Sequence, residues 1–171
     1  MGRSSINPIF KKAYLGLGSN LNDPIRQVKA ALATLADHPK IRLMASSSFY
    51  LTKPVGYLNQ PDFINAVAII TTSLMPYDLL KAMLRIEEQF GRKRTFRNAP
   101  RILDIDLLWY QDVVCADPIL TLPHPRLAQR AFVLLPLMEL DPDLLVFPNR
   151  TLKMLLARVE CEGVMRIHDI S

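Results

Sequence analysis

Two aspartates, Asp104 and Asp106, lie one residue apart in an apolar segment, and their spacing could serve chemistry. They alternate with Leu103, Ile105 and Leu107, which is the side-chain period of a β-strand. On a strand, both carboxylates would point to one face, with Cα atoms roughly 6.5–7 Å apart, so that both could reach the same cation. Asp is disfavoured in strands, and such departures from local preference concentrate at functional sites.

A basic segment precedes the aspartates. It carries five positive side chains within ten residues, namely Arg92, Lys93, Arg94, Arg97 and Arg101. Mg²⁺ in proteins binds one or two carboxylates together with waters and substrate phosphates, and arginines bind phosphate oxygens through paired hydrogen bonds. The combination favours a site for magnesium and a nucleotide triphosphate. The alternative is a solvated strand face on which the aspartates only pair with arginines.

The composition indicates one folded domain. The chain has 171 residues, of which 50% are hydrophobic, and a net charge of +5; this length is typical of a single domain. Much of the charge excess falls in the basic segment, which favours a local anion site over a broad charged surface. We expect residues 1–12 to form a flexible extension and residues 13–171 to form the domain.

The sequence predicts a cytoplasmic protein. Its two cysteines, Cys115 and Cys161, are far apart in the chain, and we expect both to be reduced, buried thiols, as in cytosolic proteins. No apolar run reaches the roughly 18–20 residues that a membrane span requires. The N-terminal segment also lacks the long apolar core of a signal peptide. We therefore expect no association with a membrane.

The hydrophobic periodicity predicts the element order β-α-β-β-α-β. The predicted strands are residues 13–17, 41–50, 63–72 and 102–110, and the predicted helices begin at Pro24 and Pro76 and end before His38 and at Gly91. This order is typical of the ferredoxin-like α+β fold, an antiparallel sheet with helices packed on it, here with C-terminal additions. The first and third strands of that fold are neighbours. The strands with Asp104 and with Asn65 should therefore belong to one sheet and face one pocket.

Three further features could serve binding. Asn65 is a polar residue in an apolar strand, and it either bonds a neighbouring loop or, beside the ring of Phe63, contacts the donors and acceptors of a heterocycle. The loop 51–62 is long for a simple connection, and such loops are often functional. His124 lies between two prolines, although a single histidine is more often structural than catalytic.

Four segments together resemble one enzyme family. They are LGLGSNL (15–21), FYLTKPVGYLNQPDFINAV (49–67), GRKRTFRNAPRILDIDLL (91–108) and LPHPRLAQRAFVLLPL (122–137). They are similar to segments of the 6-hydroxymethyl-7,8-dihydropterin pyrophosphokinases of folate biosynthesis. The resemblance implies transfer of the β,γ-pyrophosphoryl group of ATP to the hydroxymethyl oxygen of the pterin, with release of AMP. It also implies two Mg²⁺ ions as cofactors, small-molecule substrates, no nucleic-acid partner and a monomer.

The resemblance also implies roles for individual residues. Asp104 and Asp106 would hold the two Mg²⁺ ions, which clamp both ends of an in-line displacement, and Arg92 and Arg101 would be catalytic through neutralisation of phosphate charge. The residues that match nucleotide contacts are Glu87, Arg94, Thr121, His124 and Arg130. The residues that match the pterin pocket are Thr52, Val55, Phe63, Asn65 and Phe132, of which the two phenylalanines would sandwich the ring and Asn65 would contact its edge.

The sequence departs from the family in the basic loop. Some members carry a Trp that closes over the substrates, whereas this chain has Asn98-Ala99-Pro100-Arg101. Phe96 is a candidate to replace that aromatic side chain. We expect loops 51–62 and 91–101 to be mobile without ligand and to close over ATP.

Three other function classes fit parts of the sequence. A non-catalytic ferredoxin-like module would bind a small ligand or a subunit without forming AMP. An RNA-binding domain would need exposed aromatic residues on the sheet, and Asp104 and Asp106 would repel a nucleic-acid backbone there. A kinase or nucleotidyltransferase could use the same carboxylates on another acceptor. Products distinguish the enzymes: pyrophosphoryl transfer forms AMP, a simple kinase forms ADP and a nucleotidyltransferase forms pyrophosphate.

Overall fold

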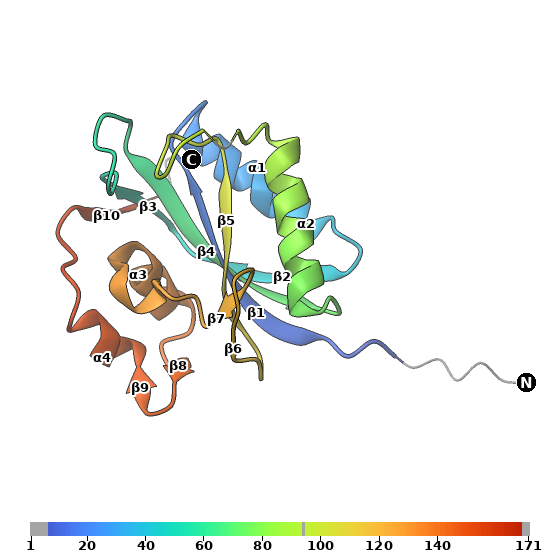
Figure 1. The fold of residues 1–171 in the computed structure, drawn as a ribbon. Coiled ribbons are helices and arrows are strands. Elements are labelled where there is room, and N and C mark those ends of the chain that lie inside the picture. Colours follow the sequence, from blue (N-terminus) through green and yellow to red (C-terminus); the bar gives the residue numbers. More distant parts are fainter. Residues whose placement is uncertain (1–6, 94, 169–171) are drawn as a thin grey trace, which may run out of the picture.

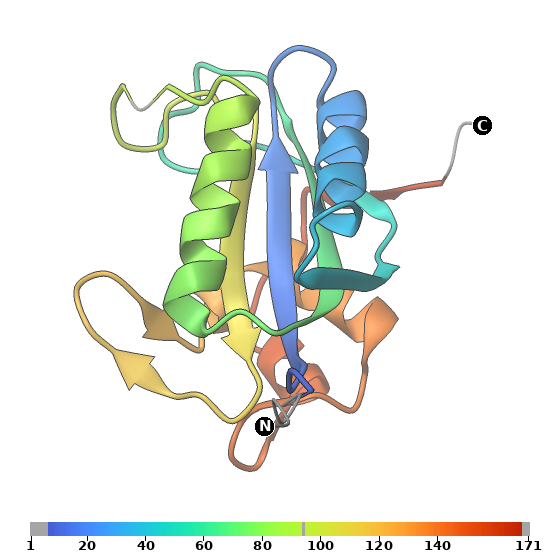
Figure 2. The same ribbon diagram turned by 90° about the vertical axis from the view of Figure 1, so that its right-hand side faces the viewer.

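The computed structural model describes residues 7–93 and 95–168, and these form three layers (Figure 1). An antiparallel sheet is the middle layer. Helices α1 (Pro24–Ala36) and α2 (Pro76–Gln89) cover one face, and α3 (Ala131–Leu140) and α4 (Leu152–Leu156) cover the other. Figure 2 looks onto α1 and α2, with the C-terminal helices behind the sheet. Among the described residues, no helix combines the length and the apolar content needed to cross a bilayer.

The main sheet has the strand order β10-β3-β4-β1-β5, and β2 also pairs with β4. The strands are β1 (Lys11–Ser19), β2 (Ile41–Ser46), β3 (Phe49–Thr52), β4 (Phe63–Thr72), β5 (Asp104–Tyr110) and β10 (Val164–Ile167). The predicted α+β class is confirmed, and the first and third predicted strands, β1 and β4, are antiparallel neighbours. Strand β1 begins two residues earlier than predicted, because Lys11 and Lys12 already pair with β4.

The second predicted strand, residues 41–50, is broken into β2 and β3. Ser47 lies in the gap and exchanges two hydrogen bonds with Val67 of β4. Its N–H donates to the Val67 carbonyl at 2.9 Å, and its side-chain Oγ accepts from the Val67 N–H at 2.9 Å. A serine hydroxyl therefore replaces a backbone carbonyl in the ladder, and the regular pairing of this strand is interrupted there.

The alternation predicted for β5 ends at Leu107. Strand β1 pairs Tyr14 with Trp109 but the next residue, Leu15, with Leu107, so Leu108 is an additional residue in a β-bulge. Trp109 then packs edge-on against the ring of Tyr14, with ring centroids 5.3 Å apart. Because the bulge reverses the side-chain direction after Leu107, Trp109 packs on the face that carries α3, whereas Leu107 packs on the face that carries α1 and α2.

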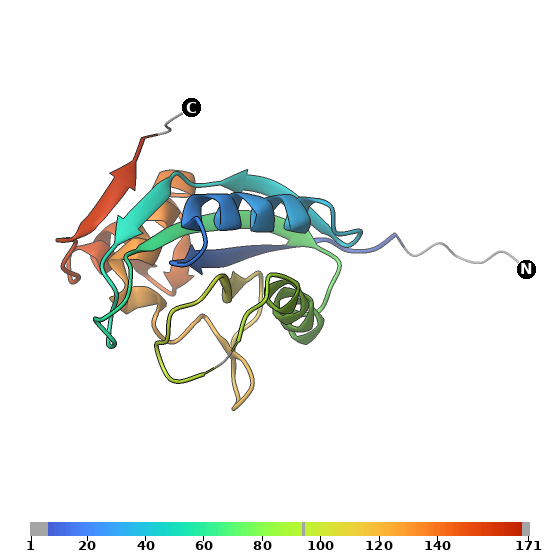
Figure 3. The same ribbon diagram turned by 90° about the horizontal axis from the view of Figure 1, so that it is seen from above.

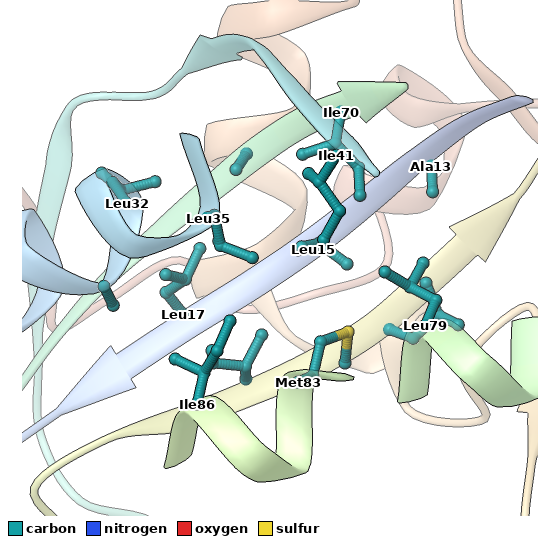
Figure 4. Packing of buried hydrophobic residues seen from close by; sticks show 14 of the residues in the cluster. Ala13, Leu15, Leu17, Leu32, Leu35, Ile41, Ile70, Leu79, Met83 and Ile86 are labelled. Atoms are coloured by element: carbon teal, nitrogen blue, oxygen red, sulfur yellow. The ribbon is translucent and has the colours of Figure 1, made fainter. Parts of the chain in front are cut away.

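Two apolar clusters hold the sheet from both sides. The first lies between the sheet and helices α1 and α2, where Leu15, Leu35 and Met83 meet (Figure 4). The second lies on the other face and joins Tyr14 and Leu137, from β1 and α3. Burial of each large aliphatic side chain contributes roughly 1.5–3 kcal/mol. The central strands are therefore the most firmly held part of the molecule.

The helix starts follow the sequence, whereas the C-terminal region differs from it. Asp23 caps α1 through its Oδ1, which accepts from the Arg26 N–H at 3.3 Å, and proline occupies the first turn of α1 and α2 as predicted. Helix α4 is short and ends at Leu156. It is followed by β10, which the sequence did not predict and which adds an edge strand beside β3. Cys161 lies just before β10 and is exposed, contrary to expectation.

Short elements connect β5 to the C-terminal helices. Strands β6 (Cys115–Ala116) and β7 (Thr121–Leu122) form one hairpin, and β8 (Leu145–Phe147) and β9 (Arg150–Thr151) form another. Between β7 and α3 the chain forms a single 3₁₀ turn, η1 (Leu127–Gln129). These connections lie against the face of the sheet that carries α3, or beside its β5 edge, where the site is found.

Candidate active site

The two aspartates lie on the face of the sheet that α3 covers. Asp104 is opposite Gly18 of β1, and Gly18 is opposite Asn65 of β4, so these residues form one cross-strand row. Asp106 begins the next row, opposite Gly16. Because the two glycines have no side chains, they leave a trough between the carboxylates and Asn65. The predicted shared face of the aspartates is observed.

Arginines bind both oxygens of Asp104. Arg92 Nη1 lies 2.8 Å from Asp104 Oδ1 and also contacts Glu87 Oε2. Arg101 Nη1 donates to Asp104 Oδ2 at 3.0 Å. Glu87 is buried, with 2% of its surface exposed, and its Oε1 accepts from the Ile105 N–H at 2.7 Å. Glu87 therefore orients Arg92 and the start of β5 from behind the aspartates, a role that the sequence did not indicate.

Asp106 is held differently from Asp104. Arg130 Nη1 lies 3.5 Å from Asp106 Oδ2, and the side chain keeps 34% of its surface exposed. Desolvation of the carboxylate, and then the charge of Asp104, raise the pKa of Asp106, although Arg130 acts in the opposite direction. A cation placed between the two aspartates would relieve this repulsion.

The carboxylates fit magnesium as a bound ion. The part of the chain that the structure describes holds no group of three or more His, Cys, Asp or Glu side chains that could bind a metal. The available protein donors are thus two carboxylates on one strand face. Mg²⁺ accepts such a set because it completes its six positions with waters and phosphate oxygens.

One cavity adjoins the trough and has a volume of about 110 Å³. Asn65 is 7% exposed in it and donates to Thr52 Oγ1 at 2.8 Å, so the orientation of its amide is set. A Cβ built on Gly18 would lie 3.1 Å from Asn65 Oδ1, so the glycine provides the space for this oxygen. The cavity is lined by all five residues expected at a pterin and by both aspartates: Thr52, Val55, Phe63, Asn65, Phe132, Asp104 and Asp106.

The two phenylalanines of this cavity are linked to the aspartates through arginines. The Arg101 guanidinium carbon lies 5.7 Å from the centre of the Phe63 ring, and that of Arg130 lies 5.6 Å from the centre of the Phe132 ring. These are cation–π distances. Since Arg101 also pairs with Asp104 and Arg130 with Asp106, each aromatic ring lies beside an arginine–aspartate pair.

A second cavity, of about 270 Å³, lies on the other side of Asp106. Thr121 and His124 line it, as does Asp106 itself. Burial, and then the charges of Arg130 and Arg126, lower the pKa of His124 to about 4. The His124 Nδ1 accepts from the Arg126 N–H at 3.1 Å. The neutral ring therefore carries its proton on Nε2, where it can be donated to a ligand.

The basic loop forms a third hollow, of about 460 Å³, lined by residues 92–93 and 95–101. Arg92 and Arg101 both line it. Arg94, which was expected to contact the nucleotide, lies outside the described residues. With Lys93 and Arg97 nearby, positive charge exceeds what the aspartates neutralise, so this end of the molecule suits a polyanion.

The two long loops contact each other at this end of the sheet (Figure 3). The rings of Tyr57 and Phe96 pack edge to face, with centroids 5.1 Å apart. Gln60 Nε2 donates to the Asn98 carbonyl at 2.8 Å. Phe96 thus replaces an absent Trp only as a contact between loops, since 56% of its surface stays exposed.

Asn20 is a site residue that the sequence analysis missed. It is 2% exposed; its Nδ2 donates to Gln60 Oε1 at 2.8 Å and to the Pro61 carbonyl at 2.9 Å. Its Oδ1 accepts from the Arg101 N–H at 2.9 Å. The amide joins both long loops to the end of β1. A buried Asn at a strand end must be hydrogen-bonded, and that rule was the available signal.

Comparisons with known proteins show which proteins the chain resembles. Residues 14–142 match the family model described as 7,8-dihydro-6-hydroxymethylpterin-pyrophosphokinase (HPPK). A 2-amino-4-hydroxy-6-hydroxymethyldihydropteridine pyrophosphokinase of Pseudomonas aeruginosa is 42% identical over 159 residues, which cover 93% of this chain and 98% of the relative. The protein of the same name from Methylorubrum extorquens is 43% identical over 156 residues, with 91% and 98% covered.

Solved structures show the same fold. A Plasmodium falciparum HPPK-DHPS variant crystallised with pterin and p-hydroxybenzoate matches 96% of this chain with a TM-score of 0.74 at 15% identity. The wild-type HPPK-DHPS with pteroate matches 90% of the chain with a TM-score of 0.70 at 16% identity. This chain spans 48% and 43% of those longer proteins.

Proposed function

The chain belongs to the 7,8-dihydro-6-hydroxymethylpterin-pyrophosphokinase family, and we propose that its two cavities hold the two substrates on either side of Asp104 and Asp106. The enzyme transfers the pyrophosphoryl group of ATP to the hydroxymethyl group of 6-hydroxymethyl-7,8-dihydropterin in folate biosynthesis, and AMP is released. One observation carries the proposed arrangement: Asp106 lines both cavities. A group that passes from one substrate to the other would cross this carboxylate.

The smaller cavity would bind the pterin. Phe63 and Phe132 would contact the faces of the ring, and Asn65, oriented by Thr52, would hydrogen-bond its edge. Val55 would cover the ring at the opening, since it lines the cavity but is 71% exposed. A site built around one fixed amide discriminates strongly against rings that lack the matching groups.

The larger cavity would bind the nucleoside, next to Thr121, and His124 Nε2 would donate a hydrogen bond to a phosphate. A neutral imidazole is the suitable donor here, because it adds no charge that would bind the product tightly. Arg130 pairs with Asp106 and lines the smaller cavity, and from there it would contact the phosphates. Arg94 would be a further nucleotide contact, and Glu87 would act from the same side through Arg92.

Asp104 and Asp106 would hold Mg²⁺, as two ions. Bound Mg²⁺ supplies positive charge that neutralises phosphate oxygens and lowers the pKa of the attacking hydroxyl. Arg92 and Arg101, released from Asp104 when it binds the cation, would then turn to the phosphates. Their charge stabilises the negative charge that builds up on the transferred group, so the chain needs no separate general base.

We propose that the protein acts as a cytoplasmic monomer whose single domain includes residues 13–171. Closure of loops 51–62 and 91–101 over ATP stays a prediction. The contacts through Asn20 and Gln60 support a motion in which both loops move together. Slow hydrogen exchange in both loops of the free enzyme would contradict their mobility.

Product analysis tests the proposed function. The chain is incubated with Mg-ATP and 6-hydroxymethyl-7,8-dihydropterin, and the nucleotides are separated. We expect AMP and the pterin diphosphate in equal amounts, and neither product when the pterin or the magnesium is omitted. Formation of ADP would indicate a simple kinase, free pyrophosphate would indicate a nucleotidyltransferase, and binding without products would indicate a non-catalytic module.

A further inference from the structure

The start of α2 is joined to the β6–β7 hairpin through one carboxylate. The Tyr77 hydroxyl donates to Asp117 Oδ2. The other oxygen, Asp117 Oδ1, accepts from the Ile119 N–H at 2.8 Å and from the Leu120 N–H at 2.9 Å. The Asp117 N–H in turn donates to the Leu120 carbonyl at 3.2 Å. Asp117 therefore organises the hairpin turn with one oxygen and attaches the turn to α2 with the other.

This turn is a wall of the larger cavity. Asp117, Ile119, Leu120 and Thr121 all line it, and Leu80, three residues after Tyr77 on α2, forms part of the facing wall. The strands of the hairpin have two residues each and pair only with one another among the described strands. No long ladder holds this wall, although Leu120 and Leu122 of the hairpin are buried in the apolar cluster beside α1 and α2. The exposed part of the turn, at Ile119, depends on local contacts such as the one from Tyr77 to Asp117.

Tyr77 has no direct access to the reaction. It is not among the residues that line the cavities beside Asp106, and 41% of its surface is exposed. Its hydroxyl bonds a residue 40 positions away in the sequence. The hydroxyl is therefore the group by which Tyr77 contacts a wall of the larger cavity.

We propose that Tyr77 is a positioning residue for the nucleotide: through Asp117 it holds the wall of the cavity against which the nucleoside of ATP packs. The inference rests on the proposed function, because that proposal places ATP in this cavity. Without the hydroxyl, the hairpin turn is no longer attached to α2. Nucleotide binding must then also order the turn, and this cost lowers the affinity for ATP. The chemical step at Asp104 and Asp106 is unaffected, because the lost hydrogen bond of Tyr77 is to Asp117 and to neither of these aspartates.

Tyr77→Phe tests this inference in the whole protein. We expect the KM for ATP to rise by about fivefold, while kcat and the KM for the pterin stay within twofold, as for lost ground-state binding. The affinity for a non-hydrolysable ATP analogue with Mg²⁺, measured by calorimetry without pterin, should fall by a similar factor. Asp117→Ala should have at least the same effect, and the double variant should be no worse than Asp117→Ala, because the two residues act as one unit.

Tyr50→Phe is the matched control. It removes the same type of bond, from the Tyr50 hydroxyl to Glu139 Oε2 at 2.6 Å, on the β3 side of the sheet. It should lower thermal stability and leave the KM for ATP unchanged. An unchanged KM for ATP in Tyr77→Phe, a loss confined to kcat, or an equal rise in Tyr50→Phe would each overturn the inference. If the unmodified protein forms no AMP, the proposed function itself fails, and that result is distinct from the other three.

Discussion

The two cavities beside Asp106 are built in different ways. The smaller is formed largely by strands of the sheet and by α3, and its polar groups include Thr52 and Asn65 on adjacent strands. The larger is formed mainly by the β6–β7 hairpin and the segment that contains His124. The comparison teaches that recognition of the pterin depends on the rigid sheet, whereas recognition of the nucleotide depends on a few contacts between short elements.

The cavities also differ in charge. The smaller has its arginines stacked on phenylalanine rings and paired with aspartates, so its interior is close to neutral. The larger contains a histidine kept neutral by burial and by adjacent arginines, and the described residues that line it include no arginine or lysine. The basic side chains lie instead around the hollow of the basic loop. This distribution matches a nucleoside in the larger cavity, with its phosphates directed towards the arginines. Four predictions test the comparison.

The largest effect should come from the residue that both cavities share. Asp106→Asn removes a negative ligand of Mg²⁺ at the point where the substrates meet, and we expect turnover to fall by ~10³-fold or more. AMP formation measures the loss, and circular dichroism checks the fold. The matched control is Asp112→Asn, since Asp112 is an exposed carboxylate that pairs with Lys11. Near-normal turnover of Asp106→Asn at saturating magnesium would contradict the proposal that Asp106 binds magnesium where the two cavities meet.

The second prediction separates the cavities. Asn65→Ala should raise the KM for the pterin by roughly 100-fold, because the amide that contacts the ring edge is lost. The affinity for ATP should stay within twofold, because Asn65 does not line the larger cavity. Substrate saturation curves measure both constants. Asn59→Ala, in an exposed part of the adjacent loop, is the control, and an equal weakening of ATP binding by Asn65→Ala would contradict the separation.

The third prediction uses the pKa of His124, which is lowered to about 4 by burial and by the adjacent arginines. Because the folded protein binds this proton less well than the unfolded chain does, stability is present above the ordinary pKa of 6.5 and is lost as the pH falls towards 4. Between pH 7 and pH 4.5, the folded-to-unfolded ratio should fall on the order of tenfold more in the natural protein than in His124→Gln. Urea unfolding at each pH measures this ratio. The same pH dependence of stability in both proteins would contradict a buried, neutral ring at His124.

The smallest effect is expected from the floor of the smaller cavity. Gly18→Ala would place a Cβ 3.1 Å from Asn65 Oδ1, a distance that forces the amide to shift slightly. We expect the KM for the pterin to rise by about threefold to tenfold without a change in the KM for ATP. In Gly16→Ala the new Cβ meets Leu108 at 3.5 Å, which is an ordinary contact that leaves Asn65 in place. Equal effects of both variants would show that the row from Gly18 to Asn65 has no special role.

Much of the fold and the catalytic centre was predictable because the signals are local. Alternation around Asp104 and Asp106 indicated a strand and a shared face, and the caps and prolines marked the helix starts. Helix and strand periods depend on residues within one or two turns, so a sequence displays them directly. The strand break at Ser47 and the bulge at Leu108 were not predictable, since each depends on a partner strand distant in the chain.

The sequence by itself determined which groups could do the chemistry: two carboxylates, a series of arginines and an amide beside an aromatic ring. Only the tertiary structure decided their arrangement around two cavities that meet at Asp106, the attachment of both loops to Asn20, and the contact of Tyr77 with Asp117. The physical reason is that these are single hydrogen bonds and packing contacts between segments far apart in the chain. Such contacts form only after the sheet has brought the segments together, and they leave no periodic pattern in the sequence.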